Sequence, residues 1–192
     1  NDILDVSMIE SGGLKYNIEK VRLKGLVDDV ASSAQVSAPE GVKVEVLMVK
    51  DDLLIDVDSI RIAQVLHNII SNAFKFTTSG YIRIRIEELN PGSVTIRISD
   101  SGAGIPAEIL PTIFDKFVTK SVGDKNIHGT GLGLYISKAI VTAHGGDLTA
   151  DNNPDGGAVF TITLPIVNCH LQRSTDPDSS GLTRPSPIAD AN

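Results

Sequence analysis

The sequence predicts an α+β fold built as one domain and followed by a tail. Residues 42–48, 82–86 and 94–98 alternate apolar and polar side chains, which is the period of a strand with one buried face. Residues 59–76 and 132–143 repeat apolar side chains every three or four positions, which is the period of a helix with one buried face. With 192 residues, of which 41% are hydrophobic, the chain is long enough to form a core.

Composition and charge exclude several classes of function. The formal net charge is −7 and the chain has no basic run, which argues against a nucleic-acid groove and against a patch for anionic membranes. No apolar segment approaches the roughly twenty residues needed to cross a bilayer, and the N-terminus lacks a signal-peptide pattern. Cys169 is the only cysteine, so an internal disulfide and a cysteine-based zinc site are excluded. A reducing, cytoplasmic setting is the simplest expectation.

The first third of the chain predicts two helices and three strands. Residues 1–10 have helical spacing and stop at Ser11-Gly12-Gly13, so they are either the end of a longer helix or a short helix docked on the domain. A short strand, a helix that runs to about Pro39 and two more strands follow, at residues 14–19, 23–39, 42–48 and 54–57. Asp56-Val57-Asp58-Ser59 then supplies capping residues for the next helix.

The helix predicted over residues 59–76 carries an apolar face and a separate polar face. The polar face holds Gln64, Asn68, Asn72 and Lys75 in register. Asparagine is unfavourable inside a helix, so two asparagines on one face suggest a functional role. The face is either an ordinary polar surface or a site where amide oxygens bind Mg²⁺ and the lysine meets a phosphate.

A strand that ends in an aspartate and two glycines is the next candidate site. Asp100 continues the buried phase of its strand, so its carboxylate is expected to point inward and to need a partner. Gly102 and Gly104 allow a sharp turn and the close approach of a ligand. The segment is either a buried acceptor at the mouth of a ligand pocket or an ordinary tight turn. Asn90-Pro91-Gly92 joins this strand to the preceding one in an antiparallel hairpin.

Glycines recur before the last predicted helix. Ile105-Pro106 begins a short helical stretch, and Phe114 and Phe117 are expected to anchor the core. Residues 118–128 lose periodicity and predict a mobile loop. The loop leads into residues 129–134, whose backbone N–H groups at a helix start favour an anion. Two interpretations are open: the loop and the helix start form a lid over phosphates, or the glycines are present only because packing or flexibility requires them.

The last part of the chain predicts a helix end, a hairpin and a tail. His144 and Gly145 are expected to cap the preceding helix. Strands are predicted at residues 148–150 and 158–164, separated by a turn rich in asparagine and glycine. Beyond Pro165 serine, proline and aspartate dominate, which predicts a disordered tail or linker.

Taken together, these segments resemble the catalytic, ATP-binding domain of sensor histidine kinases, a branch of the GHKL (Bergerat-fold) ATPases. Residues 68–77 are similar to the N box of that family, residues 100–104 to its first glycine box, residues 114–117 to its F box and residues 129–134 to its second glycine box. Residues 1–14 are similar to the end of the second dimerisation helix. The resemblance implies a two-layer α/β sandwich with a mixed, mainly antiparallel sheet and helices on one face.

The resemblance also implies a role for each box. Asp100 would accept a hydrogen bond from the exocyclic amine of adenine, Asn72 would ligate Mg²⁺, and Lys75 would contact phosphate. Lys120 is a candidate for a second phosphate contact. The set expected to bind ATP and Mg²⁺ is Asn68, Asn72, Lys75, Asp100, Gly102, Gly104, Lys120, Gly129, Thr130, Gly131, Leu132 and Gly133, with Asn72 as the metal ligand.

One position distinguishes the kinase branch from relatives that hydrolyse ATP. Those relatives place a glutamate on the N-box helix, whereas the matching residue here is Asn68, and an amide cannot act as a general base at neutral pH. We therefore expect a domain that holds ATP for a histidine on a dimerisation helix. His67, His128, His144 and His170 lie outside any such helix, so no catalytic residue is identifiable. An ATP-binding module without kinase activity is the alternative.

These expectations divide the chain into three parts. Residues 1–13 would be the truncated end of the second dimerisation helix, residues 14–165 the catalytic domain, and residues 166–192 the tail. The implied partners are the phosphoacceptor helical hairpin, a response-regulator receiver domain and a second copy in a full-length homodimer. No nucleic acid and no membrane contact are expected for these residues, whose location would be cytoplasmic even where the parent protein is membrane-anchored.

Overall fold

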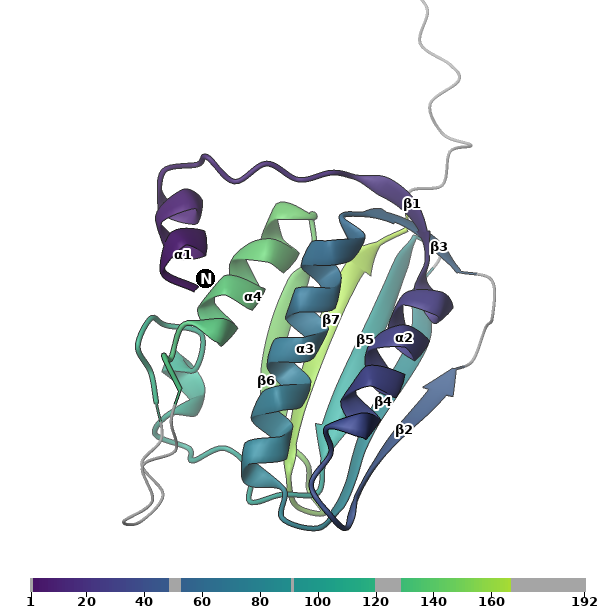
Figure 1. Ribbon diagram of the computed structural model, residues 1–192, viewed down its shortest axis with the longest axis vertical. Helices are drawn as coiled ribbons and strands as arrows, with labels where there is room; N and C mark the ends of the chain where they lie inside the picture. Colours follow the sequence, from purple (N-terminus) through teal and green to yellow (C-terminus); the bar gives the residue numbers. More distant parts are fainter. Residues whose placement is uncertain (1, 49–52, 91, 120–128, 167–192) are drawn as a thin grey trace, which may run out of the picture.

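The computed structural model describes residues 2–48, 53–90, 92–119 and 129–166. Its centre is a five-stranded sheet in the order β2-β4-β5-β7-β6 (Figure 1). β2 and β4 run parallel, and the other neighbours are antiparallel. The strands are β2 (Val42–Met48), β4 (Gly80–Asn90), β5 (Ser93–Asp100), β6 (Asp147–Asn152) and β7 (Ala158–Pro165).

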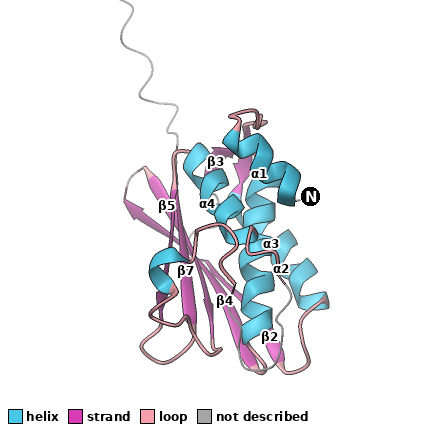
Figure 2. Cartoon of the chain, turned by 90° about the vertical axis from the view of Figure 1, so that its left-hand side faces the viewer, coloured by secondary structure: helices cyan, strands magenta, loops and turns pink. Residues whose placement is uncertain are grey.

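Helices α2 (Leu23–Val36), α3 (Ser59–Phe76) and α4 (Gly133–Ala143) cover one face of this sheet (Figures 1 and 2). The alternation in the strands explains the layering, because isoleucines such as Ile84 and Ile96 are fully buried on the helix side. Burying each side chain of this size contributes about 1.5–3 kcal/mol. The predicted α+β fold is confirmed. The described part of the chain has no helix that is both long and apolar enough to span a bilayer.

A second sheet pairs β1 (Glu19–Arg22) with β3 (Leu54–Val57) in antiparallel fashion. The strand predicted at residues 14–19 is wrong, because pairing begins only where Glu19 meets Val57. Just before it, the Asn17 backbone N–H donates to the Asp58 carboxylate at 2.9 Å instead of joining a ladder. The predicted strands at residues 42–48 and 54–57 are confirmed.

Asp58 fixes the start of α3, as the predicted cap required. Its Oδ1 accepts from the Arg61 N–H at 3.0 Å. Burial raises the pKa of this carboxyl, but the N–H groups of Asn17 and Arg61 together with the nearby positive charge of Arg61 oppose it, and the pKa is lowered overall. His144 caps α4 and adds a cross-link, since its Nε2 accepts from the Asp58 N–H at 3.0 Å. Its Nδ1 therefore carries the proton and donates to the Ile140 carbonyl at 2.7 Å.

The segment between β5 and α4 differs in part from its prediction. A short 3₁₀ helix, η1 (Leu110–Thr112), stands for the expected helical stretch. Phe114 does pack edge-on against Phe160. Phe117 is not a core anchor, because its side chain is 70% exposed; its backbone, at a φ of 64°, donates an N–H to the Gly131 carbonyl. Residues 120–128 of the predicted loop and 167–192 of the predicted tail lie outside the described residues.

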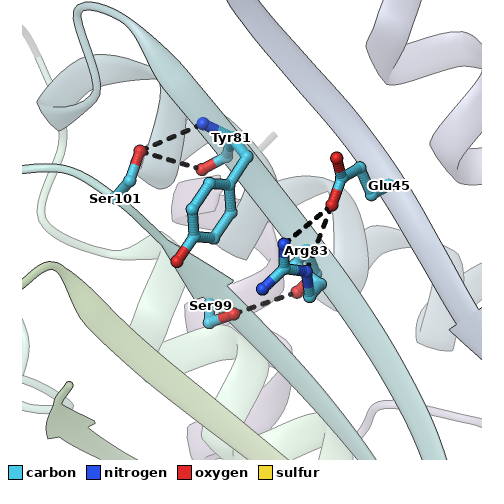
Figure 3. Close-up of polar contacts among 5 residues, drawn as sticks. All are labelled: Glu45, Tyr81, Arg83, Ser99 and Ser101. Carbon is cyan, nitrogen blue, oxygen red and sulfur yellow. Dashed lines mark hydrogen bonds and ion pairs between the residues drawn. The ribbon is translucent and has the colours of Figure 1, made fainter. Parts of the chain in front are cut away.

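The face of the sheet opposite the helices, here called the outer face, is polar. Figure 3 shows part of it, where the Arg83 guanidinium of β4 binds the Glu45 carboxylate of β2 through Nε and Nη2 at 3.1 and 3.0 Å. The Ser99 hydroxyl of β5 donates to the Arg83 carbonyl at 3.4 Å, and the Ser101 hydroxyl accepts from the Tyr81 N–H at 3.0 Å. Hydrogen bonds along this face hold the end of β5, and thus Asp100, in place.

Candidate nucleotide-binding site

A cavity lies between α3, the start of α4, the end of β5 and the segments that follow β5. It collects residues that are far apart in the sequence. Most of the predicted set lines it, namely Asn68, Asn72, Lys75, Asp100, Gly104, Gly129, Thr130, Gly131 and Gly133. Gly102 and Leu132 support the walls instead, and Lys120 lies outside the described residues. Apolar side chains complete the lining beside Asp100, including Ile105, Ile109 and Ile113.

Asp100 lines the cavity beside apolar side chains, and the residue as a whole is only 4% exposed. Its Oδ1 accepts from the backbone N–H groups of Gly102 at 2.8 Å and Ala158 at 3.2 Å. Burial raises the pKa of this carboxyl, and the two N–H groups oppose that rise. No described residue donates a hydrogen bond to Oδ2. The side chain is therefore a fixed acceptor with one oxygen left for a donor in the cavity.

The turn after β6 closes around Asp100, a feature that the sequence did not single out. Gly157 has a φ of +86°, and a Cβ there would lie 1.9 Å from the Asp100 carbonyl oxygen, so only glycine fits. At the end of β6, the Asn152 amide accepts from the Ile105 N–H at 2.7 Å and donates to the Ile105 carbonyl at 2.8 Å. The Asp-x-Gly-x-Gly turn is thus held by the end of β6 and by the turn that leads into β7, the neighbouring strand of β5.

The polar residues of α3 make two kinds of contact, one with α4 and one at the cavity. The Asn68 amide donates to the Gly133 carbonyl at 3.3 Å and to the Ser137 hydroxyl at 3.4 Å, which joins α3 to the first turn of α4. The Asn72 Oδ1 accepts from the Lys75 ammonium at 3.3 Å. This pair presents an amide oxygen and a cation to the cavity. Among the described residues no cluster of three His, Cys, Asp or Glu side chains could hold a metal, so a divalent ion here would need amide and ligand oxygens.

The second glycine segment forms the opposite wall. α4 begins at Gly133, and Leu132, its N-cap residue, is buried at 3% exposure. The Thr130 hydroxyl accepts from the Leu132 N–H at 3.3 Å. Gly131 has a φ of +65°, and a Cβ there would meet the Phe117 backbone at 2.7 Å. Gly131, Gly133 and Lys75 line the same cavity, so the N-terminus of α4, with the positive end of its dipole, lies at a wall that this lysine shares.

Helix α1 (Asp2–Glu10) adds an acid that sequence reasoning missed. Asp2 lines the cavity, and its Oδ2 accepts from the Thr130 hydroxyl at 2.9 Å. Asp5 holds the helix in place, because it accepts from Arg61 and Gln64 of α3, each at 3.1 Å. Gln64 is thereby drawn away from the asparagine face. No local pattern could reveal these contacts, since 56 or more residues separate the partners.

Comparison with known proteins identifies the family. Residues 57–168 match the family described as histidine kinase-, DNA gyrase B-, and HSP90-like ATPase, which is more than half of the chain. The chain belongs to this family. Within it, this ATPase domain has homologues in two-component signalling, and its sheet and helices match those of histidine kinase catalytic domains.

Two curated relatives illustrate the similarity of this ATPase domain. Hybrid signal transduction histidine kinase D of Dictyostelium discoideum is 35% identical over 190 residues, which cover 94% of this chain and 12% of the relative. Sensor histidine kinase WalK of Bacillus subtilis is 32% identical, with 86% of this chain and 28% of the relative covered. The chain therefore spans only a small part of the curated relatives that it matches.

Solved structures agree with the assignment. Full-length ShkA in complex with AMPPNP superposes with a TM-score of 0.76 at 27% identity, over 86% of this chain and 34% of ShkA. The nucleotide-free catalytic domain of histidine kinase ThkA gives a TM-score of 0.69 at 29% identity, over 78% of this chain and 98% of that domain. The ATPase domain fold is thus shared with a separately solved catalytic domain.

Proposed function

We propose that this ATPase domain is the catalytic part of a sensor histidine kinase, which binds Mg-ATP and presents the γ-phosphoryl group to a histidine on a dimerisation helix. The observation that carries the proposal is Asp100. Its buried carboxylate has one oxygen bound by two N–H groups, and the other oxygen faces the cavity among apolar side chains. That second oxygen can accept a hydrogen bond from an amine. Adenine offers such an amine at the position where guanine has a carbonyl oxygen, so the site favours ATP over GTP.

The other end of the cavity suits the triphosphate. Lys75 supplies a positive charge, and the N-terminus of α4 behind Gly129, Thr130, Gly131 and Gly133 supplies backbone donors. We assign Mg²⁺ to the Asn72 amide oxygen, because the described lining offers no carboxylate cluster and Mg²⁺ in such sites shares phosphate oxygens with few protein ligands. When bound, this ion neutralises phosphate charge. The chain's own contribution is to hold and orient the nucleotide.

The proposal favours phosphoryl transfer to another group over hydrolysis. Asn68 cannot accept a proton from water, and its amide is occupied with α4. The described lining holds two carboxylates, and neither stands on α3: Asp100 lies among apolar side chains, and Asp2 accepts from the Thr130 hydroxyl. The domain is therefore built to protect ATP until a nucleophile from a partner helix arrives.

The proposal includes a division of the chain and a set of partners. Residues 1–13 are assigned to the end of the second dimerisation helix, residues 14–165 to the catalytic domain and residues 166–192 to a tail or linker. The phosphoacceptor hairpin, a receiver domain and a second copy of the full-length protein are the proposed partners. Support comes from the names of relatives, which include a hybrid kinase. The proposed location is the cytoplasm.

Transfer of label from γ-labelled ATP to an added dimerisation hairpin tests the proposal. The wild-type chain should label the hairpin histidine with Mg²⁺ present, and Asn72→Ala should reduce the rate by at least about tenfold, through loss of a ligand oxygen. Asn17→Ala, the same change at an exposed position outside the cavity, should retain the rate. ATP binding without transfer would contradict the kinase assignment and leave the alternative, an ATP-binding module without kinase activity.

A further inference from the structure

Three arginines meet at the centre of the outer face. Arg83 and Arg85 lie on β4 and Arg97 lies on β5, and the strand register places Arg85 directly opposite Arg97. All three point away from the helices, because they alternate with buried isoleucines. Like charges in directly opposed positions of an antiparallel pair are destabilising. The stability of the sheet therefore does not explain this pair.

The three arginines differ in how much of their charge is already satisfied. Arg83 is held on both sides, by the Glu45 carboxylate and by the Tyr81 ring, whose centroid lies 4.3 Å from its guanidinium carbon (Figure 3). Arg85 pairs with Glu87 at 3.2 Å in a contact that is half exposed. Arg97 is exposed and makes no hydrogen bond or ion pair with any described residue. Two guanidinium groups are thus available side by side.

The surroundings leave these groups accessible. The arginines line a shallow groove whose neighbouring rows carry the short hydroxyl side chains of Ser99, Thr149 and Thr161. Short side chains do not cover the guanidinium groups, and their hydroxyls are further donors for an anion. Helices α2, α3 and α4 lie on the other side of the sheet (Figure 2), so none of them covers the groove.

We propose that this groove docks an acidic segment of a partner protein, with its carboxylates on Arg85 and Arg97. Charge complementarity supports this occupant, since the chain has 24 acidic against 17 basic residues and yet gathers three arginines here. Paired guanidinium forks match carboxylate geometry. Asp151 lines the groove, and Glu45 lies beside it in its ion pair with Arg83. Both carboxylates repel a continuous chain of phosphates, whereas separate carboxylates can avoid them. The occupant is therefore protein and not nucleic acid.

Fluorescence anisotropy with a labelled poly-glutamate peptide and the whole chain tests the proposal. The wild type should bind in a salt-dependent manner, and Arg97→Glu should weaken binding by about tenfold or more. Arg22→Glu makes the same charge change on an exposed residue of β1 and should stay within about twofold of wild type. Because the opposed arginines repel each other, Arg97→Thr should also raise the Tm of the free chain by roughly 1–3 °C.

Three results would overturn the proposal. Absence of peptide binding by the wild type would remove the site. An equal loss in Arg22→Glu would show attraction to total charge and not to the groove. Tighter binding of a single-stranded oligonucleotide than of a peptide with the same charge would replace the protein segment by nucleic acid. ATP binding serves as the folding control, because the three arginines lie outside the cavity that holds Asp100.

Discussion

Replacement of Asp100 by asparagine is the sharpest test of the nucleotide site. The carboxylate Oδ1 already accepts two backbone N–H groups, so the variant must direct its amide oxygen there. Its NH₂ group then faces the cavity, where wild type offers an acceptor. A hydrogen bond to a charged group is worth about 1.5–3 kcal/mol, so the Kd for ATP should rise roughly ten- to 150-fold.

The same substitution should change base preference without harming the fold. A raised pKa means that ionised Asp100 destabilises the folded state at neutral pH, and this cost disappears as pH falls through the raised pKa. Asp100→Asn should therefore have a Tm at pH 7 equal to or above that of wild type. Its NH₂ group can donate to the carbonyl oxygen of guanine, so the preference for ATP over GTP should shrink or reverse.

Isothermal titration calorimetry with ATP and with GTP, beside a thermal melt, provides the measurement. Asp155→Asn is the matched control, since Asp155 is exposed in the turn after β6 and should leave both affinities unchanged. An Asp100→Asn variant that binds ATP like wild type would refute the assignment of the adenine end. So would a variant whose ATP affinity falls only because its Tm collapses.

Three further substitutions test two contacts at the site and the cap at the far end of α3. Asp2→Asn keeps an acceptor for the Thr130 hydroxyl but removes a negative charge from the cavity, so ATP affinity should rise by about two- to fivefold at low salt and by less at high salt. The control Asp29→Asn should bind ATP like wild type, and weaker binding by Asp2→Asn would contradict the expected repulsion. Gly157→Ala should lower the free energy of unfolding in urea by about 3 kcal/mol or more, because its Cβ would overlap the Asp100 carbonyl oxygen. The control Gly156→Ala places its Cβ in open space and should cost only about 1 kcal/mol, so equal effects of the two variants would be inconsistent with the overlap. Asp58→Ala should lower the free energy of unfolding by about 1–2 kcal/mol at neutral pH, because the cap of α3 is lost. Since the pKa of Asp58 is lowered, the difference from wild type in thermal melts should fade as the pH drops below about 4. A difference that stays constant across pH would argue against the ionised cap.

The sequence allowed prediction of those features that depend on local period and chemistry. Ile84 and Ile96 are buried because strand alternation can be read directly, and the same phase put Asp100 on the buried side. The separate face of α3 with Asn72 and Lys75 followed from helical spacing alone. These residues reach one cavity as expected, because a helix and a strand carry their side chains in fixed directions.

What the sequence could not supply depends on contacts between distant segments. β1 begins at Glu19 because of its register with Val57, which no local pattern encodes. Phe117 has the aromatic side chain typical of a core residue, yet its backbone N–H donates to the Gly131 carbonyl and its ring is exposed to solvent. The fit of Gly157 against Asp100 and the reach of Asp2 into the cavity arise only when the chain is folded.

The attachment of α1 has an energetic consequence of its own. The helix has no fully buried residue, but Val6 and Ile9 pack partly buried against the core, and Asp5 pairs with Arg61 in a mostly buried contact. Two exposed polar contacts add to these, Asp2 with Thr130 and Glu10 with Lys116. Such pairs contribute about 0–1 kcal/mol each and weaken as salt rises. Release of the helix would therefore break the Asp5–Arg61 pair and expose the apolar side chains of Val6 and Ile9, while the fully buried core residues would stay in place.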